Sequence, residues 1–175
     1  MALRRRRVAR RVVGLSRCAS TVRRARRAGA IDAGTTDPAA AVRDADLVVL
    51  ATPVDLIAPT ARRLARFMRS GSMLTDVGST KARIVETLGG RLPRGILFVG
   101  AHPLAGSERR GLDAVDGRLF DGAVCILTPT RKTARHATQV VAQLWRRLGA
   151  RVVTMSPRDH DRLLAGTSHL PHLIA

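Results

Sequence analysis

Short apolar runs alternate along the chain with longer segments of mixed polarity. The apolar runs are rich in Val, Ile and Leu, which is typical of strands, and the mixed segments carry helical spacing. We predict strands at residues 10–16, 46–53, 72–79, 95–103, 122–129 and 151–155. We predict helices at residues 19–30, 35–45, 55–69, 80–88, 133–150 and 156–175. This alternation predicts an α/β fold, with a mostly parallel sheet and helices on both faces.

Local signals refine several of these elements. Asp37 is expected to cap a helix that has Pro38 at its first position, and Ser156 with the following proline opens the last helix. Run 46–53 is continuously aliphatic, which predicts a strand buried on both faces. Pro59 is expected in the first turn of its helix, because proline removes a backbone donor from any later turn.

Polar or small residues follow four of the predicted strands. Ligands of open parallel sheets bind beyond the carboxyl ends of the strands, so these positions predict one shared crevice. The residues are Ser16, Arg17, Thr52, Pro53, Gly78, Ser79, His102 and Pro103.

The chain begins "MALRRRRVARR", without the G-x-G-x-x-G turn that opens a dinucleotide-binding domain. We interpret this segment as the tail of the helix that follows such a turn. The first strand of the fold is therefore expected to be lacking, and in the usual order that strand is central in the sheet.

The net charge of +18 arises from 31 basic and 13 acidic residues, and Lys81 and Lys132 are the only lysines. We favour a compositional bias toward Arg and Ala over the alternative, a polyanion partner such as nucleic acid or a phosphate-rich cofactor. With 2% aromatic residues the chain has little on which bases could stack. Cys18 and Cys125 indicate neither a disulfide nor a metal site, and no apolar run approaches the ~20 residues of a membrane span. We expect a cytoplasmic protein.

Four segments carry a family resemblance: "DVGSTK", "GAHPLAGSERRG", "LFDGAVCILTP" and "DHDRLLAGTSHLPH". With these four segments in this order, the chain resembles the prephenate dehydrogenase family, which includes arogenate dehydrogenases. The resemblance implies an oxidoreductase of tyrosine biosynthesis, which oxidises prephenate with NAD or NADP and releases carbon dioxide to give 4-hydroxyphenylpyruvate. Arogenate would give tyrosine instead. It also implies an N-terminal nucleotide-binding domain and a C-terminal helical domain that forms a homodimer.

By this resemblance residues 1–155 form an incomplete nucleotide-binding domain, and residues 156–175 begin the helical domain. Two rival interpretations are kept. One is an inactive fragment whose basic surface binds polyanions. The other is a different dehydrogenase of the same fold, such as a hydroxyacid or imine reductase, which would explain "ATP" and "DVGS" but not "HPLAGSE" with "SHLPH".

His102 is the main catalytic candidate. From position alone it is equally a packing histidine satisfied by backbone or an acid–base group, and the surrounding motif favours catalysis. The resemblance implies that it bonds the ring hydroxyl of the substrate, and a neutral imidazole of pKa ~6.5 suits that task. Ser79 is implied to orient this histidine near the nicotinamide, with a helix N-cap as the simpler role. Asp76 is interpreted as structural.

The resemblance places further candidates around the substrate. Glu108 is implied to join an ionic network at the entrance of the site, with a solvated surface acid as the alternative. His169 and His172 are implied to lie against the site, and His172 is the better candidate for a substrate or cofactor contact. No third ligand accompanies them, so no metal is expected. His160 and Asp161 are interpreted as structural members of the same motif.

Ser16 and Arg17 stand where NAD-binding domains carry an acid for the ribose hydroxyls. A hydroxyl and a guanidinium suit a 2′-phosphate, so we predict a preference for NADP over NAD. The alternative is that Arg17 is one more surface arginine. Thr52 and Pro53 are predicted cofactor contacts, with an ordinary turn as the alternative.

Overall fold

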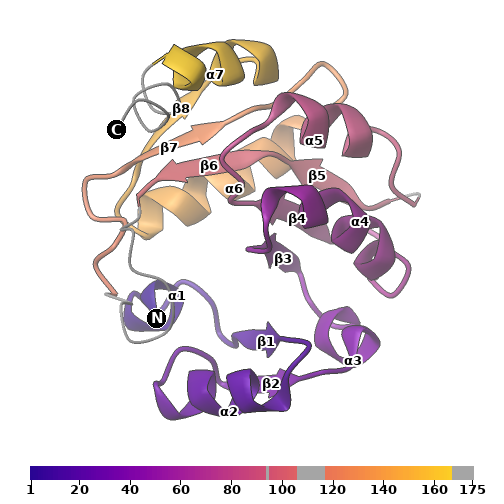
Figure 1. Cartoon of the computed structure of the whole chain (residues 1–175), viewed down its shortest axis with the longest axis vertical. Helices are drawn as coiled ribbons and strands as arrows, with labels where there is room; N and C mark the ends of the chain where they lie inside the picture. The colour runs from indigo at the N-terminus through magenta and orange to yellow at the C-terminus, as the bar shows by residue number, and fades with distance from the viewer. Residues whose placement is uncertain (94, 106–116, 167–175) are drawn as a thin grey trace.

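The computed structural model describes residues 1–93, 95–105 and 117–166 (Figure 1). Its helices are α1 (Ala2–Arg5), α2 (Ala19–Arg27), α3 (Pro38–Val42), α4 (Val54–Ala65), α5 (Ala82–Leu88), α6 (Arg135–Arg147) and α7 (Pro157–Leu164). Its strands are β1 (Val13–Leu15), β2 (Ala33–Thr35), β3 (Leu47–Leu50), β4 (Met73–Asp76), β5 (Leu97–Val99), β6 (Ala101–Leu104), β7 (Val124–Leu127) and β8 (Arg151–Thr154). No helix in these ranges is both long and apolar enough to cross a membrane.

The larger part of the sheet runs in the order β3-β4-β5 and then β6-β7-β8. All the pairings in these two groups are parallel except β6 with β7. Only Gly100 separates β5 from β6, so one extended segment pairs with β4 and then with β7 (Figure 1). A Cβ at position 100 would lie 2.5 Å from Thr128 Oγ1, which explains why glycine stands at this switch.

This switch corrects one expectation about His102. The sequence indicated a strand that ends at this histidine, but His102 is the second residue of β6 and pairs in register with Ile126 of β7. The strand continues past Gly100 because β7 supplies a new hydrogen-bonding partner. The imidazole is therefore carried by a strand that is paired along its length.

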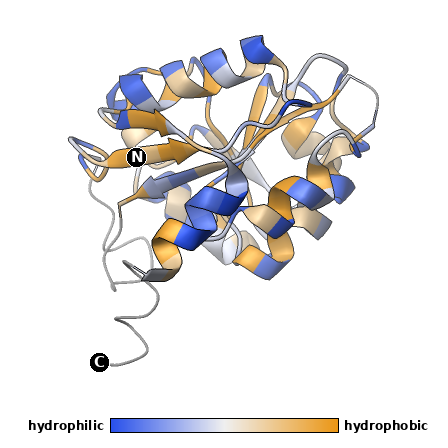
Figure 2. Ribbon diagram, turned by 90° about the horizontal axis from the view of Figure 1, so that it is seen from above, coloured by the Kyte–Doolittle hydropathy of each residue, from blue (hydrophilic) through white to orange (hydrophobic). Residues whose placement is uncertain are grey.

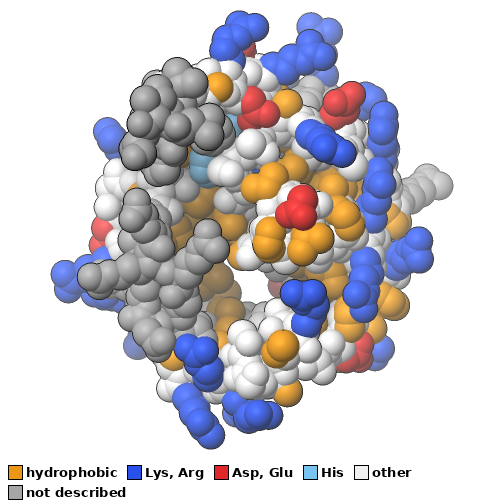
Figure 3. Space-filling model, in the orientation of Figure 1, with side chains coloured by type: hydrophobic (Ala, Val, Ile, Leu, Met, Phe, Trp, Pro, Cys, Tyr) orange, Lys and Arg blue, Asp and Glu red, His pale blue; other side chains and the backbone are white. Residues whose placement is uncertain are grey.

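β1 and β2 form a separate parallel pair. Within the described residues, β1 pairs only with β2 and β3 pairs only with β4. Figure 3 shows an opening between the part built from α2, β1 and β2 and the part above it. The prediction that run 46–53 is buried on both faces is therefore wrong. Val49 of β3 is 37% exposed, because this strand has a neighbour on one edge only.

Helices cover both faces of the larger sheet, as expected for an α/β fold (Figures 1 and 2). One core cluster joins α4 and α5 to the sheet and includes Ile57, Leu64, Leu74, Leu88 and Phe98. A second cluster joins α6 to the sheet and includes Val99, Ala101, Leu127, Val141 and Trp145. Figure 2 shows largely apolar strands between helices in which polar and apolar residues alternate.

The expected helix starts at Asp37 and Ser156 are confirmed. Asp37 accepts a hydrogen bond from Ala39 N, and Ser156 accepts one from Asp159 N. The last described helix ends at Leu164, and the predicted continuation to residue 175 lies outside the described residues from 167 onward.

Pro59 is not in the first turn, because it is the sixth residue of α4. The helix passes through it because Ile57, Ala61 and Leu64 form a buried stripe on the other side. Pro59 itself is exposed, so packing of the apolar face outweighs the missing backbone donor.

The packing of α4 gives a stability prediction. Ile57 is fully buried, so Ile57→Ala should lower the free energy of unfolding by about 2–5 kcal/mol. The neighbouring Leu56 is 41% exposed, and Leu56→Ala should change it by no more than about 0.5 kcal/mol. Urea denaturation of the two variants measures the difference. Equal losses would contradict this assignment of the buried face.

Candidate functional site

A buried ion pair lies at the end of β4. Lys81 Nζ contacts Asp76 Oδ2, and both side chains are fully inaccessible to solvent. Lys81 Nζ also donates to Ala101 O at 3.0 Å, while Asp76 accepts from Gly78 N at 2.9 Å and from Ala101 N at 3.2 Å. The pair therefore joins β4, the loop that follows it and the start of β6.

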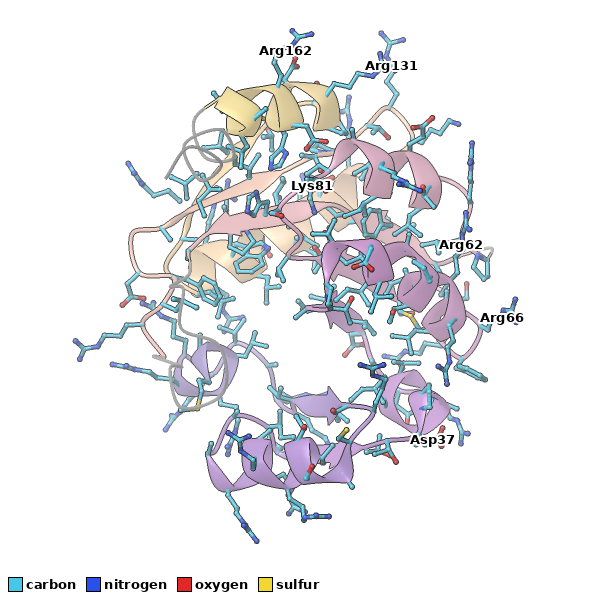
Figure 4. The ribbon with its side chains drawn as sticks, in the orientation of Figure 1. Asp37, Arg62, Arg66, Lys81, Arg131 and Arg162 are labelled. Atoms are coloured by element: carbon cyan, nitrogen blue, oxygen red, sulfur yellow. The ribbon has the colours of Figure 1, made fainter. Side chains whose placement is uncertain are left out.

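Lys81 differs from the other cations labelled in Figure 4. Its side chain lies in the interior of the protein, whereas the other labelled cations point outward (Figure 4). Those residues are Arg62, Arg66, Arg131 and Arg162. Reasoning from the sequence missed this ion pair. The available signal was a lysine in an arginine-rich chain, five residues after an aspartate that ends a strand.

Burial dominates the electrostatics of this pair. It raises the pKa of Asp76, and the attraction of Lys81 offsets that rise only in part. Burial likewise lowers the pKa of Lys81, and Asp76 offsets that change only in part. Each charge is costly without its partner, because a buried ion needs both a counter-ion and hydrogen bonds.

A row of three side chains lies beside the ion pair. His102 Nδ1 of β6 is 2.9 Å from His160 Nε2 of α7, and His160 Nδ1 is 2.7 Å from Asp161 Oδ1. The two imidazoles meet edge to face, with ring centroids 5.1 Å apart and planes at 62°. His160 is fully buried, while His102 and Asp161 are half-buried. Fifty-eight residues separate the two histidines, so only the fold brings them together.

Asp161 also closes the start of α5. Its two carboxylate oxygens accept from Lys81 N at 2.7 Å and from Ala82 N at 2.9 Å. The expectation that Ser79 caps this helix is therefore wrong. The helix begins at Ala82, and a carboxylate from α7 binds its first donors, while Ser79 is exposed in the preceding loop.

These contacts set the protonation of the row. Burial lowers the pKa of His160, and Asp161 offsets this only in part, which favours the neutral imidazole. Burial raises the pKa of Asp161, but hydrogen bonds from Ala82 N, His160 and Lys81 N outweigh it and the net pKa is lowered. The arrangement is thus an ionised carboxylate, a neutral histidine and a second histidine in sequence.

The predicted cofactor residues follow two parallel strands. Ser16 and Arg17 come directly after β1, and Ser16 Oγ accepts from Cys18 N at 3.3 Å. Thr52 and Pro53 come two and three residues after β3. Thr52 Oγ1 is buried without a hydrogen-bond partner among the described residues, as are Thr75 Oγ1 and Thr128 Oγ1, and of these three it alone lies in a loop that was predicted to bind the cofactor. These loops therefore fit a nucleotide at the carboxyl ends of the strands.

Three predicted substrate residues fall outside the described part of the chain. They are Glu108, His169 and His172, and their roles stay predictions. His160 and Asp161 were interpreted as structural members of the motif. His160 contacts His102, and Asp161 binds His160 and the backbone at the start of α5.

Known proteins share this architecture. Residues 1–154 match the family described as "Prephenate dehydrogenase, nucleotide-binding domain". A cyclohexadienyl dehydrogenase of Zymomonas mobilis is 41% identical over 152 residues, which are 85% of this chain and 52% of that protein. A prephenate dehydrogenase of Bacillus subtilis is 35% identical over 166 residues, which are 94% of this chain and 45% of that protein. The chain thus spans about half the length of these two relatives.

Two solved structures are similar along almost the whole chain. Prephenate dehydrogenase from Aquifex aeolicus, crystallised with hydroxyphenyl propionate and NAD+, has a TM-score of 0.92 and 33% identity, covering 99% of this chain and 60% of that one. Arogenate dehydrogenase of Synechocystis has a TM-score of 0.85 and 31% identity, covering 97% of this chain and 60% of that one.

The buried ion pair predicts strong coupling between two substitutions. Lys81→Met alone leaves a buried carboxylate without its counter-ion and should cost about 3–5 kcal/mol of unfolding free energy. The double variant Asp76→Asn with Lys81→Met should cost less than the sum of the single changes, as measured by urea denaturation. Arg69→Met is the matched control, because Arg69 pairs with Asp46 at the surface and should contribute only about 0–1 kcal/mol. Additive losses at positions 76 and 81 would contradict the pairing.

The row of side chains predicts acid sensitivity. Because His160 has a lowered pKa in the fold, its protonation below pH ~6.5 favours the unfolded chain. Asp161 adds a second loss at lower pH, where its carboxylate becomes protonated. His160→Gln, which has no titrating ring, should remove the first of these two losses. The measurement is unfolding free energy against pH, and an unchanged curve in the variant would rule out this cause.

Proposed function

Because the chain belongs to the prephenate dehydrogenase family, we propose that it supplies the nucleotide-binding and proton-accepting half of an NAD(P)-dependent dehydrogenase. The reaction is oxidation of prephenate with loss of carbon dioxide, which gives 4-hydroxyphenylpyruvate. The observation that carries the proposal is the placement of His102. This imidazole sits on β6 of a nucleotide-binding fold and is hydrogen-bonded through His160 to a carboxylate.

His102 is proposed to act on the ring hydroxyl of the substrate. Its imidazole accepts the hydroxyl proton as the ring carbon loses hydride and its C–O bond becomes a carbonyl. The carboxylate on the opposite ring carbon then leaves as carbon dioxide, and its bonding electrons pass through the ring to the carbonyl oxygen, which makes the ring aromatic and leaves a phenolate. The phenolate oxygen takes the proton back from His102. The histidine therefore returns to its starting state without net uptake of a proton.

A nicotinamide cofactor, when bound, accepts the hydride from the ring carbon. The chain's own contribution is to hold it, and we assign that task to Ser16, Arg17, Thr52, Pro53 and Ser79. The buried hydroxyl of Thr52, which lacks a partner within the described part of the chain, supports this assignment. The NAD+ bound in the related Aquifex structure supports a nicotinamide cofactor of either kind.

Two substrates, prephenate and arogenate, are compatible with the proposed reaction. Relatives include an arogenate dehydrogenase as well as prephenate dehydrogenases, and the two compounds differ in a side-chain keto or amino group. We propose prephenate as the substrate and arogenate as the alternative. Glu108, His169 and His172 remain the predicted substrate contacts, and assembly as a homodimer remains a prediction for the whole protein.

His102→Asn tests the proposed reaction. The variant keeps a polar side chain but loses the base, so kcat should fall by about 10²- to 10⁴-fold. The assay follows reduced nicotinamide with prephenate or arogenate and either cofactor. His136→Asn is the matched control, because His136 is exposed on α6 and should leave the rate unchanged. Turnover in H102N at the rate of the parent chain would remove His102 from the mechanism.

Arg17→Ala tests the predicted preference for NADP. Loss of a charge-assisted contact to the 2′-phosphate costs about 1.5–3 kcal/mol, or roughly a 10- to 100-fold rise in Kd for NADP+. The Kd for NAD+ should change little, since that cofactor lacks the phosphate. Arg27→Ala is the control, because Arg27 is exposed at the far end of α2. Equal weakening of both cofactors by R17A would contradict a 2′-phosphate contact.

A further inference from the structure

We propose that His160 and Asp161 are positioning residues that hold His102 in the tautomer whose Nε2 carries a lone pair. This inference rests on the proposed function of His102 as a proton acceptor. It adds a task for two residues of α7 that the sequence indicated only as structural. The hydrogen bonds that impose the tautomer begin at the carboxylate of Asp161 and run outward to His102.

Asp161 determines which nitrogen of His160 carries the proton. Its oxygens already accept from two backbone donors, Lys81 N and Ala82 N, and an ionised carboxylate can only accept. The 2.7 Å contact with His160 Nδ1 therefore requires a proton on that nitrogen. A neutral imidazole has one N–H, so His160 Nε2 is an acceptor.

His160 in turn determines the tautomer of His102. The two facing nitrogens, His160 Nε2 and His102 Nδ1, are 2.9 Å apart, and a hydrogen bond at this distance needs a single proton between them. Since His160 Nε2 is the acceptor, His102 Nδ1 is the donor. A neutral His102 is then unprotonated at Nε2, the ring nitrogen directed away from His160. That is the protonation state that a base acting on a hydroxyl requires.

The row is held rigidly from both ends. His102 is fixed by pairing of β6 with β7, and His160 is fully buried at the packed side of α7. Asp161 ties α7 to α5 through two backbone bonds. The other titratable groups nearby do not disturb the protonation of these three side chains. The opposite charges of the Asp76–Lys81 pair largely cancel, and Cys125 of β7 stays a neutral thiol because burial raises its pKa to about 12.

The same geometry accommodates the product of proton transfer. When His102 gains a proton at Nε2, its Nδ1–H bond to His160 is kept and becomes charge-assisted. The positive charge then faces a neutral imidazole that is backed by the Asp161 carboxylate. No side chain in the row has to move between the two protonation states.

The test reads the tautomer directly. Two-bond ¹H–¹⁵N spectra of histidine-labelled full chain, recorded at a pH where neutral imidazole predominates, report which nitrogen of each ring is protonated. We expect His102 as the Nδ1–H form, with its assignment made from loss of the signal in His102→Asn. An Nε2–H form in the parent chain would overturn the proposal without need of any variant.

Substitutions at position 160 test the cause. His160→Leu removes the acceptor and should populate the Nε2–H form of His102. His160→Gln keeps an acceptor oxygen near the position of Nε2 and should retain the Nδ1–H form. A His102 tautomer that is unchanged in H160L would overturn the proposal, and thermal unfolding of each variant confirms that the fold is kept.

Activity supplies the second readout. kcat should fall in H160L by at least about 10-fold, up to the 10²–10⁴ expected for loss of the base itself, and should recover in large part in H160Q. Asp161→Asn should lower kcat as well, with Asp159→Asn as control, because Asp159 is an exposed acid on the same helix. Equal kcat values in H160L and H160Q would overturn the positioning role.

The outcomes separate this inference from the proposed function. If H102N keeps full turnover while H160L still changes the tautomer, the proposed function fails and the tautomer assignment stands. If H102N is inactive while H160L changes neither tautomer nor kcat, the proposed function stands and the positioning role fails.

Discussion

The buried pair of Asp76 and Lys81 is the constraint from which the site is built. Asp76 is the last residue of β4, and its carboxylate accepts hydrogen bonds from Gly78 N in the following loop and from Ala101 N at the start of β6. Lys81 Nζ contacts the same carboxylate and donates to Ala101 O. A charged pair that is fully inaccessible to solvent is stable only when both partners and their hydrogen bonds are in place. The backbone on either side is therefore held to one geometry, and His102 is the next residue along β6.

The second row of side chains depends on that geometry. The side chain of Lys81 pairs with Asp76 and its backbone N–H donates to Asp161, so one residue links the buried pair to α7. Through Asp161 and His160 the same helix reaches His102. A disturbance of the start of α5 would thus reach the imidazole by two routes, along β6 and through α7.

Much of the architecture could be predicted from local patterns. The positions of most strands and helices, the caps at Asp37 and Ser156 and the α/β class follow from apolar spacing and backbone hydrogen-bonding needs. The short strand β2 was not predicted, because its residues form no apolar run. The errors have physical causes that lie outside any local window. Run 46–53 was expected to be buried on both faces, but its exposure depends on which strands stand beside it. Pro59 was expected at a helix start, but the buried stripe of Ile57 and Leu64 carries the helix through it.

For the catalytic candidate, too, the sequence predicted one part and the fold decided the other. The motif around His102 indicated the residue and its chemistry, because an imidazole can take up a proton near neutral pH wherever it is exposed to a substrate. The choice of ring nitrogen could not be read there, since it depends on His160, which is 58 residues away. The burial of Lys81 was equally hidden, because a lysine beside a helix start is usually solvated.

The sequence by itself determined the kinds of element, their order and the presence of a histidine within a family motif. These properties depend on interactions between residues that are close along the chain. Tertiary structure alone decided that the segment of β5 and β6 changes partners at Gly100, that Asp161 caps α5, and that the buried charge pair and two histidines meet near the end of β4. Such contacts depend on burial and on hydrogen-bond geometry between distant segments, and those quantities exist only once the chain has folded.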